Sequence, residues 1–116
     1  MSPRIRSHRI RDILEAIAKI QDYTRGMSLG EFERDAKTAD AVVRNLIVIG
    51  EAARHMPEEV AARHPDIPWR LMADLRNLAE HEYFGIRLVT IWQTLPEDLP
   101  PLVSLLERLP AVEDRD

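Results

Sequence analysis

The stretch AVVRNLIVIGEAAR, from Ala41 to Arg54, has the pattern of a helix with a wide apolar face. We predict a helix from about Lys37 to His55, because apolar residues recur in it at helical spacing. Gly50 lies on that face without a side chain, although a glycine inside a helix costs about 1 kcal/mol relative to alanine. We therefore expect a neighbouring helix to approach closely at Gly50. The other residues of this face are Ala39, Val42, Val43, Leu46, Ile49 and Ala53.

Two polar residues of the same helix, Arg44 and Glu51, are seven positions apart and therefore share one face. They form either a pair that faces solvent or a polar pair turned toward a cleft, and both interpretations stay open. Glu51 also lies four positions before His55, a spacing at which the two could share a metal ion, although such pairs are common by chance. We expect no metal and no other cofactor.

The first half of the chain contains one further long helix, expected from about Ser7 to Tyr23. Gly26 fits its C-terminal cap. Ser28 and Glu31 then have the spacing of a capping box, which predicts the start of another helical stretch. The stripe of the first helix consists of Ile10, Ile13, Leu14, Ile17 and Ile20.

Prolines mark the helix boundaries in the second half of the chain. PEEVAARH is expected to form a short helix, and Pro68 fits the first turn of a helix that stops near Gly85. The last apolar pattern is expected to break, with one short helix ending at Pro96 and another beginning at Pro100 or Pro101.

These patterns predict a single all-α domain over residues 1–116, a four- to five-helix antiparallel bundle with short connections. Hydrophobic residues make up 45% of the chain and aromatic residues only 5%, which suits packed helices better than a β-sandwich. The absence of cysteine excludes disulfides, thiolate metal sites and a cysteine nucleophile.

Charge and hydropathy narrow the class of protein further. The net charge of −4 argues against a dedicated duplex-DNA binder, which normally has a basic surface, so no DNA partner is expected. The N-terminus has no apolar region typical of a secretory signal, and the longest apolar run, LIVIG, is too short to span a bilayer. We expect a soluble cytoplasmic protein without a membrane partner.

The segment RNLAEHEYF, from Arg76 to Phe84, gathers charged, amide and aromatic side chains on a predicted helix. With Arg76 as the reference, Glu80 lies about 40° and Tyr83 about 20° around the helix, so these three share a face. Asn77 lies at about 100° and His81 at about 140°. Arg76 and His81 could therefore meet on one anion only at the rim of a cleft, or opposite copies of themselves across a two-fold axis.

These residue types are the ones that metal-free RNA cleavage requires. Arginine presents a permanent positive charge in a planar fork that matches a phosphate. Histidine exchanges a proton near neutral pH and can assist the attack of the ribose 2′-OH, while asparagine can orient either group. A simpler interpretation also stays open, in which Arg76 and Glu80 form a surface salt bridge and His81 is a cation near a helix end.

RNLAEHEY resembles the R-x4-H-x-Y signature of the HepT-like toxins, a branch of the HEPN superfamily, with Arg76, His81 and Tyr83 at the signature positions. AVVRNLIVIGEAARHMPEEV resembles the second-helix segment of that family, and IPWRLMADLRN resembles its entry to the motif helix. HEYFGIRLVTIWQTLPEDLPPL resembles the segment that follows. The resemblance runs from about Ile10 to Leu106.

The resemblance implies an all-α endoribonuclease whose homodimer combines two R-x4-H motifs into one metal-independent site. Arg76 would then stabilise the transition state, His81 would act as general acid and base, and Asn77 would orient them. RNA would be the substrate. The residues Glu80, Arg44 and Glu51 would form a supporting polar face.

The same resemblance implies a place in a toxin–antitoxin pair. HepT-like toxins are encoded beside a minimal nucleotidyltransferase antitoxin, which is thought to silence the toxin by transferring AMP to the motif tyrosine, here Tyr83. The alternative is a non-catalytic interaction domain or a nucleotide-binding domain that serves a nucleotidyltransferase. In that case the helix face around Arg76 would dock the partner or hold a phosphate.

Overall fold

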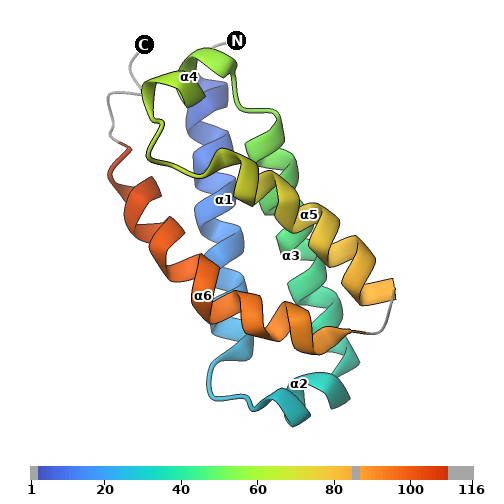
Figure 1. The fold of residues 1–116 in the computed structure, drawn as a ribbon. Coiled ribbons are helices and arrows are strands. Elements are labelled where there is room, and N and C mark those ends of the chain that lie inside the picture. The colour runs from blue at the N-terminus through green and yellow to red at the C-terminus, as the bar shows by residue number, and fades with distance from the viewer. Residues whose placement is uncertain (1–2, 85–86, 110–116) are drawn as a thin grey trace.

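The computed structural model describes the backbone of residues 3–84 and 87–109 and the side chains of residues 8–81 and 87–109. Within this part of the chain all the regular structure is helical, with four long helices and two short ones (Figure 1). The helices are α1 (Pro3–Thr24), α2 (Leu29–Arg34), α3 (Ala36–Arg54), α4 (Glu58–Arg63), α5 (Trp69–Phe84) and α6 (Leu88–Glu107). The predicted all-α helical bundle is therefore confirmed.

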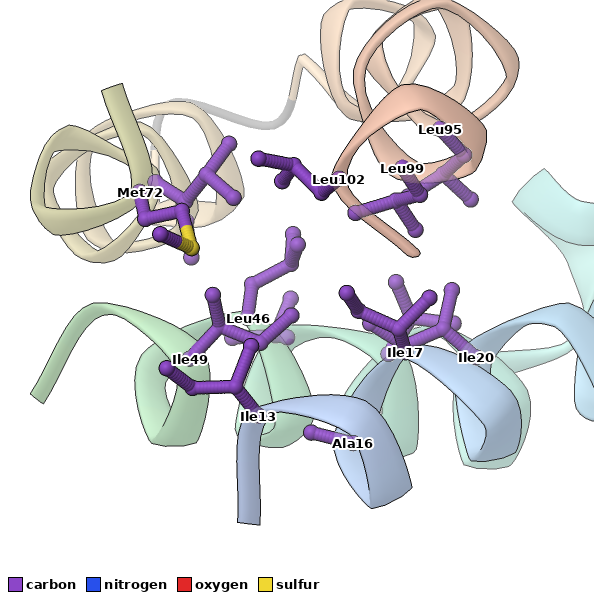
Figure 2. Close-up of a cluster of buried hydrophobic side chains, with 14 of the residues drawn as sticks. Ile13, Ala16, Ile17, Ile20, Leu46, Ile49, Met72, Leu95, Leu99 and Leu102 are labelled. Carbon is purple, nitrogen blue, oxygen red and sulfur yellow. The ribbon is translucent and has the colours of Figure 1, made fainter. Parts of the chain in front are cut away.

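The long helices form two layers, with α1 and α3 in one and α5 and α6 in the other (Figure 2). Helix α3 is the central element, because it packs extensively against both α1 and α5. The short helices lie at opposite ends of the bundle (Figure 1). Helix α2 connects α1 to α3 within one layer, and α4 lies between α3 and α5 and connects the two layers. The order of the elements in the chain thus brings α3 and α5 face to face.

Aliphatic side chains from all four long helices fill the space between the layers (Figure 2). The apolar faces predicted for the first two long helices both point into this core, which explains why those helices are stable. Burying one such side chain contributes about 1.5–3 kcal/mol. The labelled core residues are Ile13, Ala16, Ile17, Ile20, Leu46, Ile49, Met72, Leu95, Leu99 and Leu102.

Local signals in the sequence predicted several helix ends correctly. Gly26 adopts a φ of 75° in the turn after α1, a conformation that favours glycine. The Ser28 hydroxyl accepts from the Glu31 backbone N–H at 3.2 Å, and the Glu31 carboxylate accepts from the Ser28 backbone N–H at 2.9 Å. This capping box begins α2 and lowers the pKa of Glu31. The boundary expected near Gly85 lies outside the described residues.

Two expectations about helix boundaries were wrong. Helix α1 begins at Pro3, four residues before the expected start at Ser7. Helix α6 is continuous from Leu88 to Glu107 and carries its three prolines inside, where a break had been expected. Each proline removes only one backbone N–H donor, and the apolar stripe that packs against α1 and α5 continues on both sides of them. The helix changes direction along this segment instead of ending (Figure 1).

Within the described ranges, no helix is both long enough and apolar enough to cross a lipid bilayer.

Candidate active site

Helices α3 and α5 meet where Gly50 of α3 lies against Arg76 of α5. A Cβ atom placed on Gly50 would be 2.5 Å from the Cβ of Arg76 and 3.0 Å from its backbone nitrogen. It would also be 3.2 Å from the carbonyl oxygen of Ala73. Any side chain at position 50 would therefore push the two helices apart. The close approach expected at Gly50 is confirmed, and the residue that it meets is the arginine of the motif.

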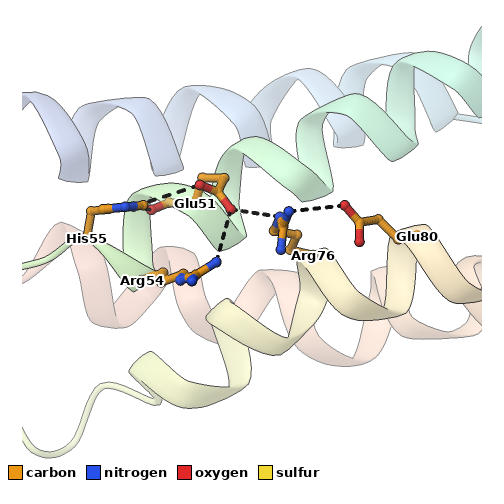
Figure 3. A network of polar contacts seen from close by, with 5 residues as sticks. All are labelled: Glu51, Arg54, His55, Arg76 and Glu80. Atoms are coloured by element: carbon orange, nitrogen blue, oxygen red, sulfur yellow. Dashed lines mark hydrogen bonds and ion pairs between the residues drawn. The ribbon is translucent and has the colours of Figure 1, made fainter.

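The guanidinium of Arg76 lies between two carboxylates (Figure 3). Its Nε is 2.7 Å from Oε1 of Glu51, which comes from α3. Its Nη2 is 3.4 Å from Oε1 of Glu80, one turn further along α5. The side chain of Arg76 is 33% exposed. Its guanidinium therefore reaches solvent at the edge of the contact between α3 and α5. The Arg76–Glu80 salt bridge predicted from spacing is present, and Glu51 adds a second, interhelical ion pair.

Further contacts hold the carboxylate of Glu51 in place. Its Oε1 is enclosed from solvent and lies 3.9 Å from Nη1 of Arg54, while Oε2 lies 3.8 Å from Nδ1 of His55. The same ring nitrogen of His55 is 2.9 Å from the backbone carbonyl oxygen of Glu51. Glu51 is therefore the centre of a polar network that joins α3 to α5 (Figure 3). Sequence reasoning missed Arg54, although its spacing of three residues from Glu51 was a usable signal.

Arg44 and Glu51, which were expected to share one face of α3, have different surroundings. Glu51 turns toward α5 and pairs with Arg76, whereas Arg44 is exposed two turns earlier on α3. The two residues share a helix face without sharing a contact in the described part of the chain. Arg44 instead borders a shallow depression on the outer face of α3, with Asp40, Val43, Ile47 and Val48.

The other motif residues lie on the following turns of α5. Asn77 and His81 are both exposed. Among the described contacts, none joins either of them to Arg76, as their positions around the helix lead one to expect. His81 is in the last turn of α5, where the helix dipole favours a cation. Tyr83 is in the same turn, and its side chain lies outside the described part of the structure.

Glu51 and His55 have a spacing at which they could share a metal ion, but other contacts account for the position of the Glu51 carboxylate. The two side chains are close enough to interact, but Arg76 and Arg54 already surround the carboxylate. Across residues 8–81 and 87–109, no three His, Asp or Glu side chains are grouped so that they could hold a metal ion.

This arrangement is suited to an anionic ligand that must be held and then protonated or deprotonated. A fixed guanidinium binds a phosphate through parallel N–H donors. An exposed imidazole one turn away can exchange protons with a group that reaches both residues. In one copy of the chain the two groups point to different sides of α5, so a composite site requires a second surface.

Comparisons with known proteins give this geometry a family context. The model of the ribonuclease HepT-like family matches residues 13–109 of the chain. A protein of Thermococcus cleftensis named "Probable ribonuclease HepT" is 42% identical over 106 residues, which cover 90% of this chain and 96% of the relative. A Methanocaldococcus jannaschii protein, named as a proposed RNase, is 41% identical over 98 residues, which cover 84% of this chain and 81% of the relative. No solved structure matches the chain.

Proposed function

Because the chain belongs to the ribonuclease HepT-like family, and its enzyme class is therefore ribonuclease, we propose that Arg76, Asn77 and His81 form its cleavage site. One observation carries the proposal: the backbone and Cβ of the motif arginine lie against Gly50 in the α3–α5 contact, while its side chain is still 33% exposed. The contact with Gly50 fixes the part of α5 from which the guanidinium extends to the surface.

The proposed reaction is an internal transesterification that needs no metal. His81 takes the proton of a ribose 2′-OH, and the 2′ oxygen forms a bond to the adjacent phosphorus. Arg76 stabilises the negative charge on the pentacoordinate phosphorane. The bond from phosphorus to the 5′ oxygen then breaks, and that oxygen takes up a proton. The products are a 2′,3′-cyclic phosphate and a 5′-OH end, and DNA is not cleaved because it lacks the 2′-OH.

A homodimer supplies what one copy lacks in this scheme. One imidazole cannot take a proton from the 2′-OH and give a proton to the leaving oxygen in the same step. A second copy, related by a two-fold axis, would present its own His81 and Arg76 to the same phosphate. The exposed position of His81, away from the Arg76 network, supports this arrangement.

Control of the site by a nucleotidyltransferase antitoxin follows from the same proposal. AMP on the Tyr83 hydroxyl would bring a phosphate to the last turn of α5, about 20° around the helix from Arg76. That added negative charge would compete with RNA for the guanidinium. Mass spectrometry of the peptide that contains Tyr83, from cells with and without the neighbouring nucleotidyltransferase, checks this step. An unmodified Tyr83 in a silenced toxin would contradict it.

The ribonuclease proposal is tested by induction in a bacterial host and by cleavage of RNA in vitro. Wild-type protein should arrest growth and produce 2′,3′-cyclic phosphate ends, and a chelator should leave cleavage unchanged. Arg76→Ala and His81→Ala should each slow cleavage by at least roughly 100-fold and relieve the growth arrest. Arg70→Ala and His8→Ala are the matched controls, since both residues are exposed and lie outside the motif.

A second function is favoured by one observation, the pairing of Arg76 with two carboxylates. Those carboxylates would suit a surface that docks a protein partner as well as they suit one that binds RNA. In this alternative the domain binds a nucleotidyltransferase or a nucleotide without catalysis. Arg76→Ala would then weaken partner or nucleotide binding, and a well-folded wild-type protein would neither arrest growth nor cleave RNA.

A further inference from the structure

The two carboxylates that contact Arg76 differ in how they are held. Glu80 is on the same helix as Arg76, four residues later, and its Oε1 lies 3.4 Å from Nη2. Glu51 comes from a different helix, and its Oε1 lies 2.7 Å from Nε. An i, i+4 contact forms and breaks by side-chain rotation alone. The Glu51 contact depends on where α3 lies relative to α5, so it is part of the packing.

The backbone around Glu51 fixes that position. Gly50, the preceding residue, allows the α3 backbone to lie against the Cβ and backbone nitrogen of Arg76. Arg54 and His55 hold the carboxylate from the α3 side, at 3.9 Å and 3.8 Å. The carboxylate is therefore restrained by its own helix before it contacts Arg76.

Glu51 contacts the guanidinium of Arg76 at Nε, so another part of the guanidinium remains available for a ligand. The ion pair with Glu51 is measured at Nε and the ion pair with Glu80 at Nη2, so neither of these distances involves Nη1. An arginine binds a phosphate best through two parallel N–H donors. With Glu51 on Nε and Glu80 rotated away, the edge formed by Nη1 and Nη2 can face an anion.

We propose that Glu51 is the positioning residue for Arg76: it orients the guanidinium through Nε, without touching RNA, so that the Nη1–Nη2 edge faces the scissile phosphate. Glu80 is the carboxylate that the phosphate displaces. The inference rests on the proposed ribonuclease function and adds a division of roles between two similar side chains. A misplacement of about 1 Å costs roughly 100-fold in rate, so the hold on Nε has a direct effect on catalysis.

Kinetics of four variants test the positioning role in the full-length protein. Glu51→Ala should lower kcat by roughly 10- to 100-fold with little change in KM, because the transition state depends on the orientation of Arg76. Glu51→Gln keeps the size of the side chain and an oxygen beside Nε and loses the charge, so it should recover part of that loss. Glu80→Ala should lower KM, since a competing carboxylate is removed. Glu33→Ala, which removes an exposed glutamate on α2, is the control and should behave as wild type.

The Arg76→Ala background separates positioning from a direct role. Because Glu51 acts through Arg76, adding Glu51→Ala to Arg76→Ala should cause no further loss of kcat. If the double variant loses the same factor again, Glu51 contacts the substrate itself and the proposal is wrong. If Glu51→Ala lowered the apparent kcat only because part of the protein is unfolded, Glu51→Gln would not restore kcat.

A second readout works without cleavage, by NMR of the arginine Nε–H groups. The Arg76 signal is identified by its loss in Arg76→Lys, and an Nε–H that lies against an oxygen enclosed from solvent exchanges slowly with water. Its exchange should become fast in Glu51→Ala and stay slow in Glu80→Ala and Glu33→Ala. If the signal responds in this way but wild type does not cleave RNA, the ribonuclease proposal fails and the hold of Glu51 on Arg76 stands. If wild type cleaves RNA and Glu51→Ala keeps its kcat, the positioning proposal fails alone.

Discussion

The two ends of the Arg76–His81 motif lie in different surroundings, although they are only five positions apart on one helix. At Arg76, helix α5 is pressed against α3, and the side chain is held by a carboxylate from the other helix. At His81, in the last turn of the helix, the side chain is exposed. The fold of one copy thus fixes the anion-binding end of the motif and leaves the proton-transferring end open to another surface.

The difference suggests how the two residues can be changed independently. Substitutions at the Arg76 end should alter both stability and activity, because Arg76 packs against Gly50 through its Cβ and contacts Glu51 through its guanidinium. Substitutions at the His81 end should alter activity alone. Four experiments use this contrast, and they follow in decreasing order of expected effect.

Loss of the histidine should have the largest effect, and only on catalysis. His81→Ala is expected to slow RNA cleavage by roughly 10² to 10⁴, the usual contribution of a general acid or base. Its free energy of unfolding should stay within about 0.5 kcal/mol of wild type, as for other exposed sites. Cleavage assays and denaturant unfolding measure the two quantities. A clear loss of stability in His81→Ala would show that this end of the motif is also part of the packing.

Adding a side chain at Gly50 should have the largest effect on the free energy of unfolding. Gly50→Ala places a Cβ 2.5 Å from that of Arg76, and such overpacking costs about 1–3 kcal/mol. The gain in helix propensity, about 1 kcal/mol, offsets only part of this cost. Urea denaturation gives the change directly.

The matched control for this substitution is Gly30→Ala in α2. A Cβ at Gly30 meets only the guanidinium end of Arg34, at 3.2 Å, and this flexible side chain can move away. Gly30→Ala should therefore be neutral or slightly stabilising. If both alanine variants unfold at the same urea concentration, α3 and α5 do not depend on the close contact at Gly50.

How far the sequence predicts this site depends on the range of each interaction. The class of fold, the glycine contact and the Arg76–Glu80 pair follow from periodicity and from spacings within one helix. The Glu51–Arg76 pair does not, because residues 51 and 76 lie on different helices and the rotation of α3 about its axis decides which residue Glu51 meets. Spacing within α3 places Arg44 and Glu51 on one face, but it cannot show which residue of α5 contacts Glu51. The continuity of α6 was missed for a similar reason, since packing on both sides of the prolines overrides their local preference.

Removal of the Arg76 guanidinium alone should lower the free energy of unfolding less than Gly50→Ala does. Arg76→Ala keeps the Cβ that packs at Gly50 and deletes only the charged end. The enclosed oxygen of Glu51 then loses its nearest described cation, and we expect a loss of about 1 kcal/mol, the upper end for partly exposed pairs. Thermal or urea unfolding beside Arg70→Ala, an exposed arginine on the same helix, measures the difference. Equal stability of the two variants would mean that the interhelical pair contributes nothing.

The smallest effect is expected from Glu80, and it separates the two carboxylates of Arg76 by their response to salt. Glu80→Gln removes an i, i+4 pair whose side chains are 33% and 41% exposed, so the loss should be a few tenths of a kcal/mol. Because ions screen exposed charges, this difference from wild type should vanish near 1 M salt, where the screening length is about 3 Å. The loss in Arg76→Ala should persist at the same salt concentration, since Oε1 of Glu51 is enclosed from solvent. If salt removed both losses equally, the Glu51 contact would be an ordinary surface ion pair, and the contrast between the two ends of the motif would rest on the packing at Gly50 alone.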